Sequence, residues 1–188
     1  MTYDPRMVAT FGFVSGISAI LALVFVAIFF AGVPVFGPLN DIALLVMALA
    51  AFPVIHWLGG GRPLTWVADA GLAAWSVLQA LMIVRLVDYD YQTGRSWAFV
   101  VSSLGLAVFG GALVAILLTG APVSGALKWI GIVAGVGFVV MGVGIPTFGT
   151  FSPLTYVGGL GWQLGWPVFA IWLARNLVVA GTSAPNHG

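Results

Sequence analysis

The chain contains no cysteine and no glutamate, and its charged side chains are six Lys or Arg and five Asp among 188 residues. The absence of cysteine excludes disulfide bonds, thiolate catalysis and thiolate metal sites. Charged residues make up 6% of the chain, whereas about a quarter is usual for a soluble domain. A formal net charge of +1 provides no basic surface for nucleic acid. Composition therefore excludes a soluble globular domain and a nucleic-acid partner.

Sequence motifs for catalysis and for metal binding are also missing. No Gly-x-Ser-x-Gly, His-Glu-x-x-His or phosphate-binding loop occurs in the chain. The only histidines are His56 and His187, and His187 belongs to a polar tail, so a multi-histidine metal centre or a bis-histidine haem is not expected. We predict that the protein is not an enzyme and that it has no catalytic residues, no metal and no cofactor.

Long apolar runs dominate what is present. A helix needs roughly 20 mostly apolar residues to span a bilayer, and six stretches meet this requirement, at about 9–31, 42–58, 64–87, 97–119, 127–146 and 155–179. The runs are too continuous for alternating barrel strands, and a bilayer leaves helices as the alternative. We therefore predict an all-α integral membrane protein, a single membrane domain over residues 1–188 with six transmembrane helices.

The distribution of basic residues predicts the orientation. With six crossings, one face of the membrane carries Arg6, Arg62, Lys128 and Arg175, and the other carries Arg85 and Arg95 beside Asp88 and Asp90. Because Lys and Arg concentrate on the cytoplasmic side, both termini are predicted to be cytoplasmic, in an inner (plasma) membrane. Tryptophans near predicted helix ends fit interfacial anchors: Trp57, Trp66, Trp129 and Trp172 on the cytoplasmic side and Trp97 on the outer side.

The chain contains an internal repeat. Residues 32–42, beginning Gly-Val-Pro-Val, match residues 120–130, beginning Gly-Ala-Pro-Val, and the sequence Pro-Leu-Thr-Trp-Val at 63–67 matches Pro-Leu-Thr-Tyr-Val at 153–157. Residues 11–85 and 99–175 are thus predicted to be two copies of a three-helix unit. Since each unit has an odd number of helices, the second copy enters the membrane from the opposite side. The prediction is two inverted-topology repeats related by a pseudo-twofold axis.

Polar residues inside the apolar runs are the candidate site. Asp69 has Ser76 and Gln79 on or near its face of the third predicted helix, and an intramembrane carboxylate calls for a role or a partner. It would either line a cavity, binding ligand or coupling transport to protons, or form a structural ion pair with Arg175. Trp162, Gln163 and Trp166 would help to form an aromatic pocket. Both Asp69 and Gln163 depart from the repeat, which has Gly159 and Ala73 at the matching positions.

Two functions remain open from the sequence. The first is a transporter or channel for a small neutral, aromatic or lipid-like solute, with its site between the two inverted repeats, as in other proteins of that architecture. The second is a non-transporting scaffold or accessory subunit that packs against a larger complex or holds a lipid, quinone or pigment. The expected partners are the lipid bilayer and either a second copy, forming a homodimer, or a larger membrane complex.

Overall fold

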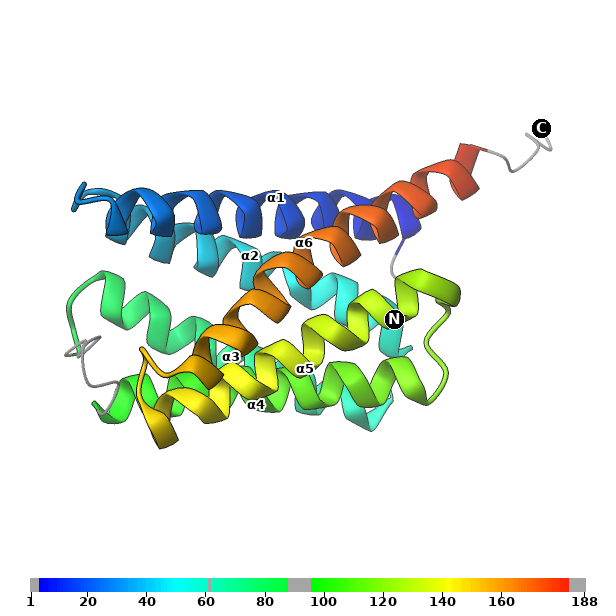
Figure 1. Ribbon diagram of the computed structural model, residues 1–188. Helices are drawn as coiled ribbons and strands as arrows, with labels where there is room; N and C mark the ends of the chain where they lie inside the picture. The colour runs from blue at the N-terminus through cyan, green and yellow to red at the C-terminus, as the bar shows by residue number, and fades with distance from the viewer. Residues whose placement is uncertain (1–3, 61, 88–95, 183–188) are drawn as a thin grey trace.

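The six predicted apolar stretches form six helices in a computed structural model, which describes residues 4–60, 62–87 and 96–182. The helices are α1 (Pro5–Phe30), α2 (Phe36–Gly59), α3 (Pro63–Ile83), α4 (Trp97–Leu118), α5 (Gly125–Phe148) and α6 (Pro153–Thr182) (Figure 1). Asp88, Asp90, Arg95 and His187, on which parts of the sequence analysis depend, lie outside the described residues. The all-helical prediction is confirmed.

Proline and glycine set most of the helix limits. Pro5, Pro63 and Pro153 are the first residues of α1, α3 and α6, where a missing backbone N–H removes no helical hydrogen bond. Gly60 and Gly149 follow α2 and α5 with φ of +59° and +89°. Only glycine adopts such angles at no steric cost, so each residue stops its helix and turns the chain.

Three helix limits differ from the predicted ones by four residues or more, and the first is the start of α1, which lies at Pro5 rather than at about residue 9. α2 begins at Phe36 rather than at residue 42, because Pro38 falls within the first turn, where its missing N–H is tolerated. This places Asn40 and Asp41 on the helix rather than in a connector. α3 ends at Ile83 rather than at residue 87, and Arg85 just beyond it has φ of +57°.

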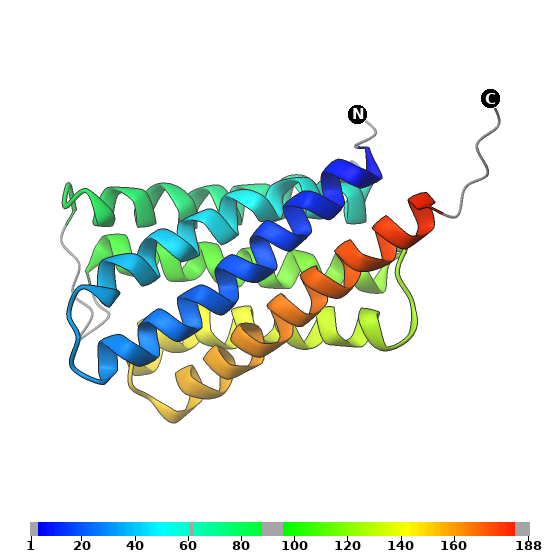
Figure 2. The ribbon, with the colours of Figure 1, turned by 90° about the horizontal axis from the view of Figure 1, so that it is seen from above.

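The six helices form a closed ring. Each helix packs against its neighbours in the chain, and α6 packs against α1 to complete the circle. Figure 2 shows α1, in blue, between α2 and α6. The start of α1 and the end of α6 lie at the same end of the bundle (Figure 1). We refer to this as the terminal end, and to the opposite one as the far end.

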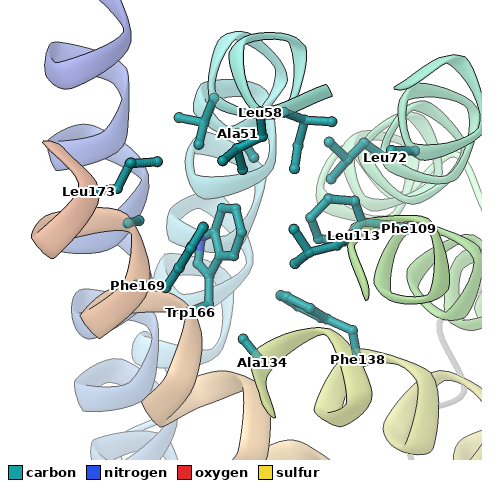
Figure 3. Close-up of a cluster of buried hydrophobic side chains, with 14 of the residues drawn as sticks. Ala51, Leu58, Leu72, Phe109, Leu113, Ala134, Phe138, Trp166, Phe169 and Leu173 are labelled. Atoms are coloured by element: carbon teal, nitrogen blue, oxygen red, sulfur yellow. The ribbon is translucent and has the colours of Figure 1, made fainter. Parts of the chain in front are cut away.

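Aromatic side chains fill the middle of the ring. Phe109 of α4, Phe138 of α5, and Trp166 and Phe169 of α6 are at most 1% exposed (Figure 3). The Phe109 and Phe138 rings meet edge to face with centroids 5.1 Å apart, and Trp166 meets Phe109 edge to face at 5.7 Å. Aromatic rings prefer edge-to-face contacts to face-to-face sandwiches. Together these side chains fill the interior of the bundle.

Glycine brings the helix backbones together around this core. A Cβ atom built on Gly71 of α3 would lie 2.6 Å from the Gly105 carbonyl oxygen of α4, and one built on Gly110 of α4 would lie 2.5 Å from the Gly135 carbonyl oxygen of α5. Lipid is as apolar as the core, so membrane helices associate through close packing rather than by escaping water. Small residues at these contacts therefore hold the ring together.

Five of the helices, α1 to α5, are long and apolar enough to cross a membrane. α6 is also long, at 30 residues, but Gln163, Arg175 and Asn176 lower its mean hydropathy. Large apolar side chains remain exposed along the outside of the bundle, including Ile17 at 51%, Leu49 at 54% and Val133 at 55%. An apolar outer surface is compatible with contact to the lipid bilayer, and the chain has the form of a multi-pass membrane protein.

Candidate functional site

A cavity of about 220 Å³ opens into the far half of the ring. All six helices contribute to its wall, because it is lined near the C-terminal ends of α1, α3 and α5 and near the N-terminal ends of α2, α4 and α6. At its rim, Phe30 is 55% exposed and Tyr156 is 52% exposed. We call it the central cavity. Its polar wall includes Asn40, Asp41, Gln79, Ser102, Thr155 and Gln163.

The polar wall is built around Asp41. The Asn40 amide nitrogen donates to the Asp41 Oδ1 atom at 3.3 Å, and the Gln79 side chain of α3 lies near this carboxyl group. Gln79 is itself 6% exposed. Among the described residues, no Lys, Arg or His nitrogen lies within 4.0 Å of the Asp41 carboxyl oxygens, since the one ion pair they form is elsewhere. Asp41 therefore has amide groups near it there but no cationic partner.

Aromatic residues form another part of the cavity wall. Trp75 of α3, Phe99 of α4 and Trp162 of α6 are at most 9% exposed and line the cavity with Tyr156. Trp162 stacks on Phe138 with centroids 5.0 Å apart and an interplanar angle of 17°, and its Nε1–H donates to Met141 Sδ at 2.8 Å. These contacts hold the indole in one orientation. The cavity thus has aromatic residues and a carboxyl group in the same wall.

Several hydroxyl groups also reach the cavity. Ser103 donates to the Phe99 carbonyl oxygen at 2.7 Å, and Thr155 donates to the Gly149 carbonyl oxygen at 2.9 Å. Both therefore use their hydrogen within the protein and retain acceptor capacity. The Thr150 hydroxyl is buried and has no hydrogen-bond partner. An unpaired buried hydroxyl is costly.

Asp69 lies at the other end of α3. Ten residues separate it from Gln79, which corresponds to about 15 Å along a helix. Its Oδ2 atom is 2.6 Å from His56 Nε2 of α2, and the Trp66 ring meets the His56 ring edge to face at 5.9 Å. Asp69 does not line the central cavity. In the structure it belongs to a contact between α2 and α3 at the terminal end.

The predicted ion pair between Asp69 and Arg175 is not formed. α3 packs between α2 and α4, whereas α6 packs between α5 and α1, so similar depth does not bring the two residues together. Arg175 is exposed and borders an apolar groove of about 430 Å³ between α1 and α6. Asp69 takes His56 as its partner instead, because the short α2–α3 connector holds these two helix ends together.

The other predicted site residues divide between the cavity and the core. Gln79, Trp162 and Gln163 line the central cavity together, and Gln163 also borders the groove between α1 and α6. Ser76 is 5% exposed, has no hydrogen-bond partner and does not line the cavity. Trp166 is fully buried and donates from Nε1–H to Ser15 Oγ at 3.0 Å. It fills the core and forms no part of the cavity wall.

Asn40 and Asp41 are site residues that the apolar runs do not reveal. The predicted runs at 9–31 and 42–58 leave both residues in the connector between the first two helices, where an acid needs no explanation. Two signals were available: Pro38 is permitted in a first helical turn, and the repeat matches Asn40-Asp41 with Lys128-Trp129, so the acid departs from the shared pattern as Asp69 does.

The described residues include no group of three or more His, Cys, Asp or Glu side chains placed to hold a metal ion. The polar groups of the central cavity are amides, hydroxyls and one carboxyl group, which suit a ligand bound by hydrogen bonds and charge. Comparisons of the chain with protein-family models, with curated proteins and with solved structures found no match.

Proposed function

We propose that this protein transports a small solute across the plasma membrane and binds it in the central cavity. The observation that carries the proposal is a cavity lined by all six helices of an apolar bundle, with several polar side chains and one carboxyl group in its wall. Intramembrane polar groups of this kind mark solute pathways in membrane proteins. Below the cavity, the buried rings of Phe109, Trp166 and Phe169 block the terminal half of the ring. A solute would enter from the far end.

The proposal includes an inverted pair of three-helix units, residues 11–85 and 99–175. In support of two repeated units, α1 and α4 end at Phe30 and Leu118, and α3 and α6 begin at Pro63 and Pro153, the same spacings as in the sequence match. Gly32 and Gly120 follow α1 and α4 with φ of +98° and +121°. The connectors after α1 and α4 lie at opposite ends of the bundle (Figure 1).

Differences between the two units fit a carrier that opens to one side at a time. The cavity residue Gln79 matches Phe169, which is fully buried in the core. α2 and α3 also pack together less extensively than α5 and α6, which meet along Gly137, Gly158 and Gly161. In inverted-repeat transporters, the two repeats exchange such conformations and expose the site to the other side.

Blocking the cavity tests this proposal. A Cβ atom on Gly159 of α6 would meet only Met141 Sδ, at 3.9 Å, so the side chain of Gly159→Leu extends into the cavity without displacing a helix. Gly111 of α4 has equally open space but is exposed on the outside, and Gly111→Leu is the matched control. In proteoliposomes supplied with a panel of small labelled solutes, we expect saturable uptake by the wild type and the control, and its loss in Gly159→Leu. Uptake that survives in Gly159→Leu would exclude this cavity as the path.

A scaffold or accessory subunit is the second candidate. The groove between α1 and α6 is apolar, has a volume of about 430 Å³ and is bordered by the exposed Ile20, Leu164 and Val168, which would suit a lipid or a partner helix. Purification in mild detergent separates the two functions. Recovery of a monomer or homodimer without a partner, quinone or pigment counts against the scaffold, whereas a stoichiometric companion would favour it.

A further inference from the structure

We infer that the solute is a small organic cation: its ammonium group binds Asp41, and its apolar body lies against the aromatic wall. This inference rests on the proposed function of the central cavity and names the chemical class of its ligand. From the sequence alone, the apolar interior favours a neutral, aromatic or lipid-like solute. The position of Asp41 changes that expectation.

The carboxyl group of Asp41 is the first part of the argument. An ionised carboxylate in a membrane-embedded site is costly unless a cation compensates its charge. The described residues provide one amide hydrogen bond, from Asn40, a nearby amide, from Gln79, and no cation within 4.0 Å. None of the described Lys and Arg residues lines the cavity. The missing positive charge would be supplied by the ligand.

The remaining basic groups are engaged elsewhere or lie outside the cavity wall. Among the described residues, Arg85 is the basic group at the far end, but it lies exposed just beyond α3 and does not line the central cavity. Arg62 donates to the carbonyl oxygens of Gly59 and Thr119, at 2.8 and 2.9 Å, at the terminal end. Lys128 lies near the start of α5, also at the terminal end, and Arg175 borders the groove between α1 and α6. Because none of these side chains lies beside Asp41, an anionic solute would meet an uncompensated carboxylate. The charge of the cavity therefore selects against anions.

Aromatic rings complete the recognition. The aromatic residues Trp75, Phe99, Tyr156 and Trp162 line the same cavity as Asp41. Aromatic faces attract ammonium groups electrostatically, and they also pack against a flat or compact apolar body. A carboxylate with several rings is the combination that recognises an amine carrying an apolar group.

The volume limits the size of the ligand. A cavity of roughly 150 Å³ admits benzene, and drug-sized ligands occupy about 300 to 1,000 Å³. At about 220 Å³, the central cavity would take one ring or a short branched chain together with an ammonium group. A whole lipid, a quinone with its tail or a pigment exceeds this space.

Calorimetric binding to the full chain in lipid nanodiscs tests the inference, with benzylamine and benzyl alcohol as probes. Benzylamine is protonated at neutral pH, and benzyl alcohol has the same ring and nearly the same shape without the charge. Both probes also partition into the lipid of the nanodisc. Only the part of the binding signal that Gly159→Leu abolishes is therefore assigned to the cavity. We expect the wild type to bind benzylamine at least about tenfold more tightly than benzyl alcohol.

Two acid-to-amide variants identify the charge responsible. Asp41→Asn should reduce benzylamine affinity about tenfold, to the level of benzyl alcohol, while Asp69→Asn, an acid outside the cavity, should leave the preference unchanged. Equal affinity of the wild type for both probes, no cavity binding of either probe, or loss of the preference in Asp69→Asn instead of Asp41→Asn would overturn the inference. If Asp41→Asn does not fold, the comparison of the two probes on the wild type still tests whether the cavity prefers a cation.

Flux separates this inference from the proposed function. Benzyltrimethylammonium is permanently charged and does not cross lipid unaided, so its uptake into proteoliposomes reports carriage. Cavity binding of benzylamine that depends on Asp41, without uptake of benzyltrimethylammonium, would support the cation site and contradict transport. Uptake of neutral solutes that Gly159→Leu abolishes, without any preference for the cation, would support transport and overturn the cation site.

Discussion

The Ser15 hydroxyl group joins three helices through two hydrogen bonds. It accepts from Trp166 Nε1–H of α6 at 3.0 Å and donates to the Met47 carbonyl oxygen of α2 at 2.9 Å. Ser15 and Trp166 are both fully buried. Ser15→Ala leaves the indole N–H without an acceptor inside the core, so we expect the free energy of unfolding to fall by about 1–3 kcal/mol. Unfolding in mixed detergent micelles measures the change.

Ser103 is the control for this prediction, because it matches Ser15 in the repeat. Its hydroxyl donates to the Phe99 carbonyl oxygen of its own helix at 2.7 Å. Ser103→Ala removes the donor and leaves no buried group without a partner, so the change in the free energy of unfolding should stay within about 0.5 kcal/mol. An equal decrease in the free energy of unfolding in the two variants would show that the hydrogen bond to Trp166 adds no stability beyond that of a hydrogen bond within one helix.

Single residues of the candidate site were only partly predictable. Gln79, Trp162 and Gln163 stand out as polar or aromatic groups inside apolar runs, and they do line one cavity. Asp69 stands out equally but pairs with His56. This partner was not predictable, because the sequence indicates the depth of a residue in the membrane but not which helix lies beside it. Asp41 escaped notice because hydropathy alone did not place it within a helix.

Neighbouring glycines of α4 have opposite surroundings, which provides a test at the scale of helices. A Cβ on Gly110 would lie 2.5 Å from the Gly135 carbonyl oxygen and 2.6 Å from Phe138 Cβ, so Gly110→Ala must push α4 away from α5. Overpacking of this kind costs about 1–3 kcal/mol. A Cβ on Gly111 would meet only Val139 Cγ2, at 3.9 Å, and Gly111→Ala should be neutral or stabilising by up to about 1 kcal/mol.

The same micelle unfolding assay compares both alanine variants with the wild type. A similar result for the two would mean that α4 and α5 do not meet through Gly110, and the packing of this interface would then have to be revised. Near-ultraviolet circular dichroism provides a second measurement. Gly110→Ala should loosen the contact between Phe138 and Phe109, whose ring centroids lie 5.1 Å apart, and so change the aromatic signal of the core. Gly111→Ala should leave that spectrum unchanged.

Helices were easier to predict than their faces. Runs of apolar residues identified all six helices, and the errors lay at ends, where Pro38 fits inside a first turn and α3 stops at Ile83. The inward face of a membrane helix has no such signal, because lipid and core are both apolar and hydrophobic periodicity is weak. Which of Gly110 and Gly111 touches α5 therefore follows from the fold and not from the sequence.

At the scale of the whole molecule, the closed ring of helices determines which side chains share the interior. Because α6 packs against α1, all six helices surround one interior, and side chains from both proposed repeats meet there. In the terminal half that interior is filled by Trp166 and Phe169, and in the far half it is the central cavity with Asp41. The same scaffold thus presents a filled and an open half, as a carrier captured facing one side would.

The inverted arrangement makes a prediction about the two sides of the membrane. Val35, before α2, and Ser124, before α5, are exposed residues at nearly matching places in the proposed repeats, and they lie at opposite ends of the bundle (Figure 1). Because the chain has no cysteine, Val35→Cys and Ser124→Cys each introduce a unique thiol. In intact cells, a membrane-impermeant maleimide should label Val35→Cys, since the termini are proposed to be cytoplasmic.

Ser124→Cys should react only after the membrane is permeabilised, because Arg62 and Lys128, on its side of the bundle, favour the cytoplasmic face. The reverse pattern would keep the inverted repeat and reverse its orientation, so that the central cavity would face the cytoplasm and export would become the natural direction. Labelling of both thiols from the same side would contradict an odd number of crossings between them. Inverted repeats and a site shared between them would then both have to be abandoned.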